Sequence, residues 1–246
     1  MDDVFAIPLP PSSSRRQALR QLVATGSTAL AAGALGAAFT RPLLAHERPY
    51  DLAPDLTPAQ ALAELYAGNA RFVGGQVMAP NRNMARLREV AAGQKPFAAF
   101  LGCADSRVPI EIVFDQGFGD VFVTRIAGNV ADPAIIGSLE FGTLVLGAKV
   151  LYILGHSKCG AVQATIAGQE VPGQISTLYQ HIRRAAKDAK GDLTLAIARN
   201  VQIQAEILQE ASPVIARLMK EGKLVIAGGV YDLDTGRVTP ISVTTP

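Results

Sequence analysis

The chain contains no tryptophan, only two cysteines and only three histidines among its 246 residues. Two cysteines form at most one disulfide bond, which excludes the disulfide-rich scaffolds of small secreted proteins. Charged residues make up 18% and the formal net charge is +2, so the chain lacks the basic surface with which nucleic-acid-binding proteins attract phosphates. Hydrophobic residues make up 49%, which is ample for a packed core. We therefore expect a folded domain with no nucleic-acid partner.

Residues 1–45 differ in composition from the rest and have the layout of an export signal. Arg15 and Arg16 precede the uncharged stretch 21–40, which is rich in alanine, glycine and leucine, and small residues follow it. The arginine pair predicts a signal peptide of the twin-arginine type, with the folded domain in residues 46–246 and an extracytoplasmic, typically periplasmic, location. A retained membrane anchor is the alternative, but the glycine and alanine content disfavours stable membrane insertion.

The charge of the predicted mature domain differs from that of the whole chain. Residues 1–45 hold four of the 23 basic and two of the 21 acidic residues, which leaves 19 of each in the remainder. A formally neutral domain favours a small neutral substrate, or a small anion attracted by a local site, over a polyanion.

Strand and helix patterns alternate along residues 46–246. Apolar runs predict strands at 96–102, 120–127, 149–155 and 223–233, with an edge strand at 237–243. Helical spacing predicts helices from Thr57-Pro58 to Gly74-Gly75 and at 83–92, 133–147, 160–168, 175–189 and 193–221, the last broken at Ser212-Pro213. This order predicts an α/β fold with a mostly parallel central sheet, flanking helices and an antiparallel C-terminal edge strand.

Both cysteines and one histidine follow two of these strands. Cys103, Asp105 and Arg107 follow the first expected strand, and His156 and Cys159 follow the third. Ligands bind at the carboxyl ends of parallel strands, so these side chains converge if the two strands are neighbours. Two thiolates and an imidazole with one open position suit a catalytic zinc ion and disfavour magnesium or calcium. The cysteines as small core residues, or as a disulfide in an exported protein, are the alternatives.

Three motifs carry a resemblance to a known family: CADSRVP, FDQGFGDVFVTRIAGN and SLEFGTLVLGAKVLYILGHSKCGAV. From about residue 57 onward, the chain resembles a β-class carbonic anhydrase. The resemblance implies reversible hydration of CO2 to bicarbonate and a proton by a zinc-bound hydroxide. It implies zinc held by Cys103, His156 and Cys159, one ion per subunit. It also implies a homodimer or higher homo-oligomer with active sites at the subunit interface.

The resemblance also implies a catalytic pair, Asp105 and Arg107. Asp105 either pairs with Arg107 and accepts a hydrogen bond from the hydroxide, or closes the site as a fourth zinc ligand. Some members of the family have an allosteric bicarbonate site built on a tryptophan and an arginine, at the positions of Phe100 and Arg125 here. Phenylalanine has no indole N–H to donate, so we expect the open state with Asp105 paired to Arg107.

Substrate contacts are expected from five further residues. Gln94 matches the offset of a glutamine that donates to the substrate in the resembled family, and the pocket wall falls on Phe122, Ala127 and Phe141. Gly160 begins a helix after the second cysteine, where its backbone N–H can face an anion.

Other functions remain open from the sequence alone. The same zinc chemistry could hydrolyse a related heterocumulene, carbonyl sulfide or carbon disulfide, and a non-catalytic zinc-binding protein is a further alternative. A thiol redox protein is disfavoured because the cysteines do not form a Cys-x-x-Cys motif. We expect His46 and His181 to be exposed to solvent.

Overall fold

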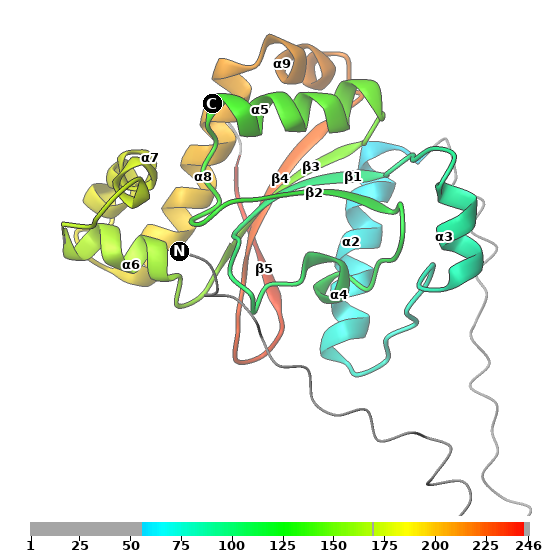
Figure 1. Ribbon diagram of the computed structural model, residues 1–246, viewed down its shortest axis with the longest axis horizontal. Coiled ribbons are helices and arrows are strands. Elements are labelled where there is room, and N and C mark those ends of the chain that lie inside the picture. Colours follow the sequence, from blue (N-terminus) through cyan, green and yellow to red (C-terminus); the bar gives the residue numbers. More distant parts are fainter. Residues whose placement is uncertain (1–55, 169, 244–246) are drawn as a thin grey trace, which may run out of the picture. The chain divides into compact units, whose positions relative to one another are not determined.

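A five-stranded sheet forms the centre of the computed structural model, which describes residues 56–168 and 170–243. The strand order is β2-β1-β3-β4-β5; the first four strands are parallel and β5 is antiparallel to β4 (Figure 1). The strands are β1 (Ala98–Gly102), β2 (Val121–Arg125), β3 (Val150–His156), β4 (Val225–Tyr231) and β5 (Val238–Ile241). The predicted α/β fold class is thereby confirmed, including the antiparallel edge strand.

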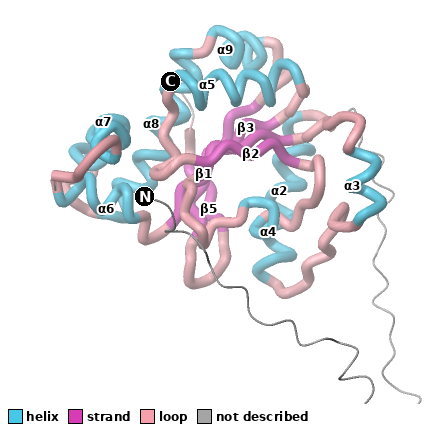
Figure 2. The backbone as a smooth tube through the Cα atoms, viewed as in Figure 1, coloured by secondary structure: helices cyan, strands magenta, loops and turns pink. Residues whose placement is uncertain are grey.

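Helices cover both faces of this sheet (Figure 2). They are α2 (Pro58–Val73), α3 (Met84–Val90), α4 (Ile110–Val113), α5 (Pro133–Glu140), α6 (Gly160–Ala167), α7 (Ile175–Asp188), α8 (Leu193–Ala211) and α9 (Pro213–Lys220), with a π-helical segment η1 (Phe141–Val145) after α5. The apolar faces of α2 and α4 pack on one side of the sheet, and those of α5, α8 and α9 pack on the other. Over the described residues, no helix is both long enough and apolar enough to cross a membrane.

Strands β1 and β3 are buried along their whole length, which is why their sequences are continuous apolar runs. Alternate residues face opposite sides of the sheet. On one side the rings of Phe100, Phe114 and Tyr152 form an aromatic cluster with centroids 5.1 to 5.6 Å apart. On the other side Leu101 and Ile153 join the core beneath α5, α8 and α9. The carboxyl ends of β1 and β3 therefore extend from a fully buried part of the sheet.

Local sequence signals fix several helix starts where they were expected. Thr57 and Gln60 form a reciprocal capping box around Pro58, the first residue of α2. Ser212 accepts a hydrogen bond from the Ile215 N–H and separates α9 from α8. The expected break at Ser212-Pro213 is therefore confirmed.

The predicted helix 133–147 is wrong in its second half, which winds as the π-helix η1. The Leu146 N–H donates to the carbonyl of Phe141, five residues earlier, at 3.1 Å. Gly142 packs against the ring of Phe122, and a Cβ atom at this glycine would lie 2.7 Å from the ring. The contact joins residues far apart in the sequence, so helical spacing alone does not reveal it.

Candidate metal centre

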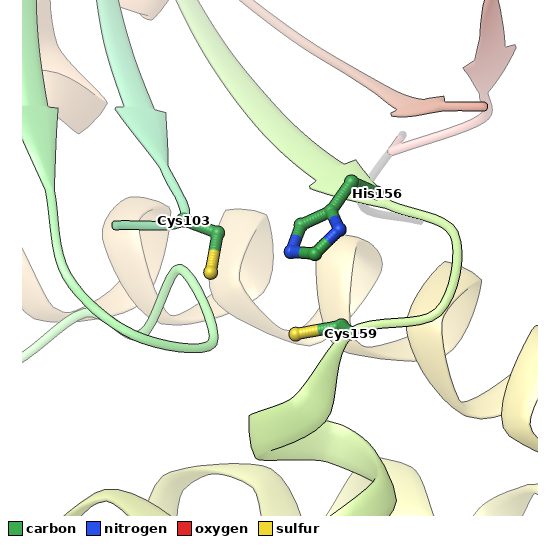
Figure 3. A group of neighbouring side chains, drawn as sticks. All are labelled: Cys103, His156 and Cys159. Atoms are coloured by element: carbon green, nitrogen blue, oxygen red, sulfur yellow. The ribbon is translucent and has the colours of Figure 1, made fainter. Parts of the chain in front are cut away.

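Cys103, His156 and Cys159 meet at the carboxyl edge of the sheet (Figure 3). Strands β1 and β3 are parallel neighbours, with Gly102 opposite Leu154. Cys103 follows β1 directly, His156 is the last residue of β3, and Cys159 is the N-cap of α6. All three side chains are buried, and one ligand atom from each lies within 4.8 Å of the others. The convergence predicted from the strand ends is confirmed, and we call these three residues the metal centre.

The histidine is oriented to offer a lone pair to this centre. Its Nδ1 lies 2.9 Å from the carbonyl oxygen of Ser157 and donates to it, because a carbonyl only accepts. The proton on Nδ1 leaves Nε2 as the unprotonated nitrogen, and among the described residues the buried Nε2 has no hydrogen-bond partner. A buried polar atom without a partner is costly, and a metal ion would satisfy it. Two sulfurs and one nitrogen are ligands that zinc prefers, so the residues fit a zinc ion.

A hydrogen bond between the two cysteines shifts their pKa values in opposite directions. The pKa of Cys103 is lowered to about 4, first because the Cys159 thiol donates a hydrogen bond to its thiolate. Burial opposes this shift, and the backbone N–H of Gly128, 3.3 Å from the Cys103 sulfur, supports it. The pKa of Cys159 is raised because the same hydrogen bond and burial both hold its proton. The centre therefore favours the thiolate form of Cys103, which is the form that binds metals.

Asp105 lies beside the centre in a two-point pair with Arg107. The Nε and Nη2 atoms of Arg107 donate to the two carboxylate oxygens at 2.9 and 2.8 Å, and its backbone N–H donates at 2.9 Å. These bonds hold the pKa of Asp105 below its ordinary value. One carboxylate oxygen lies 3.8 Å from His156 Nε2. An ionised carboxylate is thus fixed at the edge of the metal centre.

Arg125 has a role that the sequence did not indicate. Its Nε donates to the carbonyl of Cys103 at 2.8 Å, and its Nη2 donates to the carbonyl of Asp105 at 2.5 Å. The guanidinium therefore holds the loop that carries both residues. Phe100, which with Arg125 matches the position of the allosteric bicarbonate site in some relatives, is fully buried in the aromatic cluster. The place of Arg125 at the end of β2, opposite Gly102, brings it to this loop.

The expected substrate residues fall into two groups. Ala127 is half-buried and precedes Gly128, whose N–H contacts Cys103, and Gly160 is exposed at the start of α6. These two residues border the metal centre.

The second group lies toward the amino ends of the strands. Phe122 is opposite Ala99, three residues or about 10 Å before the level of Gly102. Its ring is 6.4 Å from that of Phe141 in η1, and Gln94 is exposed ahead of β1. Within one chain, this group is not brought to the metal centre.

His181 is not one of the residues that meet at this centre. His181 is half-buried on α7, where its Nε2 lies 3.3 Å from the side-chain nitrogen of Gln180. The side chain is thus in partial contact with solvent, on the helix face that was expected to be solvated. His46 and the predicted signal lie outside the described residues.

Comparison with known proteins agrees with the site. The sequence model of the carbonic anhydrase family matches residues 98–238. The chain is 38% identical over 192 residues to "Carbonic anhydrase 2" of Mycobacterium tuberculosis, covering 75% of this chain and 93% of that protein. The structure of a Coccomyxa β-carbonic anhydrase in complex with acetazolamide matches with a TM-score of 0.58 and 26% identity, over 76% of this chain and 86% of that one.

A third comparison supports the fold alone. The structures of two tetrameric β-carbonic anhydrases from Sordaria macrospora match with a TM-score of 0.59 at 23% identity, over 73% of this chain and 96% of the matched one. Together with the family match over residues 98–238 and the M. tuberculosis relative, these findings show that the chain belongs to the β-class carbonic anhydrase family.

Proposed function

We propose that this protein catalyses the reversible hydration of CO2 to bicarbonate and a proton, with one zinc ion per subunit. The observation that carries the proposal is the buried set of two sulfurs and an unpartnered Nε2 beside an ionised carboxylate. A bound zinc ion supplies Lewis acidity, which lowers the pKa of a coordinated water to about 7.

The residues around the metal centre provide orientation and charge. The carboxylate of Asp105 accepts a hydrogen bond from the attacking water and aims it at CO2. The two-point contact with Arg107 keeps this carboxylate ionised and away from the metal, which is the open state. The backbone N–H of Gly160, at the start of α6, faces the anionic product. Ala127 forms part of the apolar wall that CO2 requires.

The second group of substrate residues acts from a partner subunit. Three large apolar residues of η1 are exposed to solvent: Phe141 by 47%, Leu144 by 44% and Val145 by 63%. Such a patch is typical of a subunit interface. In our proposal this face of one subunit covers the metal centre of its partner. Gln94, Phe122 and Phe141 then reach the partner's CO2 pocket, in a homodimer or a higher oligomer.

Residues 1–45 act as a cleaved twin-arginine signal in this proposal, and residues 46–246 form the exported, extracytoplasmic enzyme. The arginine pair, the uncharged stretch behind it and the neutral charge of the remainder support this division.

The substitution Cys159→Ser tests the function. A neutral hydroxyl replaces a thiolate ligand, so we expect zinc content and CO2 hydration to be lost together. Zinc is measured by elemental analysis and hydration by stopped-flow, with wild-type protein as reference and circular dichroism to establish folding. A folded variant with full zinc and wild-type turnover would refute the assignment. Zinc-loaded wild-type protein that hydrolyses carbonyl sulfide but does not hydrate CO2 would refute the choice of substrate.

A further inference from the structure

The segment between His156 and Cys159 is tied to the turn that connects β4 and β5. The Ser157 N–H donates to the carbonyl of Tyr231 at 2.8 Å, and the Leu233 N–H donates to the Ser157 hydroxyl at 2.9 Å. The ammonium of Lys158 lies 2.7 Å from both carboxylate oxygens of Asp234. One backbone bond therefore joins this two-residue segment to the end of β4, and two further contacts join it to the turn, of which the ion pair is the outermost.

Lys158 has a backbone conformation that is unfavourable for a lysine. Its φ angle is +57°, in the left-handed region that glycine adopts freely and lysine rarely adopts. A glycine would fit this backbone with less strain, but it would leave Asp234 without its partner.

A hollow of about 410 Å³ borders the same segment. Ser157 and Lys158 form part of its rim, and apolar residues of α8 and β4, including Ile197 and Val230, form its walls. The segment is not packed against the core on that side. On that side the contacts with Tyr231 and the turn hold the segment in place of close packing, and the buried side chains of His156 and Cys159 flank it.

Hydrogen bonds within the turn hold the backbone around Asp234. One carboxylate oxygen of Asp232 accepts hydrogen bonds from the backbone N–H groups of Asp234 and Thr235 and from the Thr235 hydroxyl. These bonds fix the backbone on both sides of the Asp234 side chain. The ion pair therefore connects the segment to a pre-formed support.

The segment also contacts one ligand of the metal centre, His156, and the neighbouring pair of Asp105 and Arg107. The carbonyl of Ser157 accepts the Nδ1 proton of His156 and so sets the orientation of the imidazole. The carbonyl of Lys158 lies 3.5 Å from Nη2 of Arg107, the residue that holds Asp105. A shift of the segment would disturb both the ligand and the carboxylate.

We propose that Lys158 and Asp234 are positioning residues of the metal centre: their ion pair holds the Ser157–Lys158 segment against the β4–β5 turn, so that His156 and Cys159 keep the geometry that retains zinc. This inference rests on the proposed function.

The variants Asp234→Asn and Lys158→Gly test the proposal in the full-length, zinc-loaded protein. The measured quantity is the rate of zinc transfer to the chromogenic chelator 4-(2-pyridylazo)resorcinol. Both variants should lose zinc about three- to fivefold faster, the size of effect expected of an exposed ion pair. The value of kcat should fall by a similar factor with KM unchanged. Lys158→Gly is informative because it relaxes the backbone; if backbone conformation alone mattered, this variant would retain zinc at least as well as wild type.

Glu221→Gln is the matched control. It removes another exposed ion pair, between Lys223 and Glu221 at 2.8 Å, which lies outside the segment and the turn. It should leave the rate of zinc loss unchanged. The exchanged pair Lys158→Asp with Asp234→Lys restores the contact with reversed charges and should bring zinc loss back toward the wild-type rate.

Two results would overturn the proposal. One is zinc loss in Asp234→Asn within the range of the Glu221→Gln control; the other is failure of the exchanged pair to improve on the single variants. Amide hydrogen exchange on metal-free protein adds an independent test, because residues 156–160 should exchange faster in Asp234→Asn and unchanged exchange would also refute the proposal. A wild-type protein that binds no zinc would refute the proposed function, whereas the exchange test would still decide whether the ion pair holds the segment.

Discussion

The main partner of the Arg107 side chain is Asp105, with which it makes its two short hydrogen bonds. Arg107→Ala removes the two side-chain hydrogen bonds to Asp105 and keeps the one from the backbone N–H. The carboxylate is then free to move onto the metal, and the orientation of the attacking water is lost. We expect kcat for CO2 hydration to fall by about 100-fold, as when positioning and proton acceptance fail together. Stopped-flow assays from about pH 6 to 9 provide the measurement.

Arg183→Ala is a suitable control for this variant, because Arg183 is exposed on α7. Arg107→Lys should recover only part of the rate, since an ammonium cannot make the two-point contact. An Arg107→Ala protein within threefold of wild-type kcat would contradict the role assigned to the pair.

The sequence predicted the residues of the metal centre because each follows an apolar run that reads as a buried strand. That rule is local in the chain and needs only the neighbourhood of β1 and β3. The role of Arg125 could not be predicted in the same way. It depends on the alignment of β2 with β1, which places Arg125 opposite Gly102, and no local pattern encodes that alignment.

Among the elements, helix starts were more predictable than helix interiors. Thr57, Asp132 and Ser212 each cap a helix through a side chain three residues from its partner, so their signal lies within one turn. The four-residue helix α4 is too short for periodicity to reveal, and η1 contains Gly142, which packs against Phe122 of a distant strand. Elements shaped by tertiary contacts thus escaped the sequence analysis.

Asp115 connects the end of α2 to the segment before β2. Its buried carboxylate accepts hydrogen bonds from Nε of Arg71 at 2.7 Å and from the backbone N–H groups of Met78 and Ala79 at 3.0 and 2.9 Å. Burial raises its pKa, but these donors outweigh burial and the net pKa is lowered. The ionised form therefore stabilises the fold above the ordinary aspartate pKa of about 3.9, and this contribution is lost as the pH falls below that value.

Asp115→Asn should lower the free energy of unfolding by about 3 kcal/mol at pH 7, because Arg71 loses a buried partner. The loss of stability between pH 5 and pH 3 should also be shallower than in wild type. Urea denaturation at pH 7, 5 and 3 measures both effects, and Asp188→Asn, at a more exposed position, is the control. Equal pH slopes in Asp115→Asn and wild type would contradict the role given to this carboxylate.

At the scale of the whole molecule, the order of strands and helices was enough to predict the fold class, since parallel strands joined by helices allow few arrangements. The order of strands and helices does not predict which residues contact a partner subunit. Nothing in the order of Gln94, Phe122 and Phe141 indicates that they lie away from the metal centre of their own chain. Only the structure shows this placement, and the proposal of a partner subunit follows from it.

Val145→Glu tests the proposed interface. Val145 is 63% exposed in η1, so a charge there should leave the fold intact and destabilise the contact between subunits. We expect a shift toward monomer in analytical ultracentrifugation and at least a tenfold lower kcat/KM, with zinc content unchanged. Leu195→Glu, at a position 60% exposed on α8, is the matched control. A variant that stays oligomeric, or a monomer with full activity, would contradict the shared site.

The type of the predicted signal in residues 1–45 determines whether the protein is exported folded or unfolded. Twin-arginine export carries proteins that have already folded, whereas the general route carries unfolded chains. For this protein the difference has a chemical consequence. Cys103 and Cys159 are close together in the fold, and folding in the reducing cytoplasm lets them bind zinc before they reach an oxidising compartment.

Replacing Arg15 and Arg16 by lysines keeps the charge and removes the planar guanidinium groups that distinguish the twin-arginine signal. The precursor should then remain in the cytoplasm as a folded, zinc-loaded protein. Cell fractionation with immunoblotting shows the location, and zinc analysis of the retained precursor shows its loading. Arg20→Lys, outside the pair, should leave export unchanged. Efficient export of the double variant would mean that the chain travels by the general route, and the cysteines would then have to meet zinc in competition with disulfide formation.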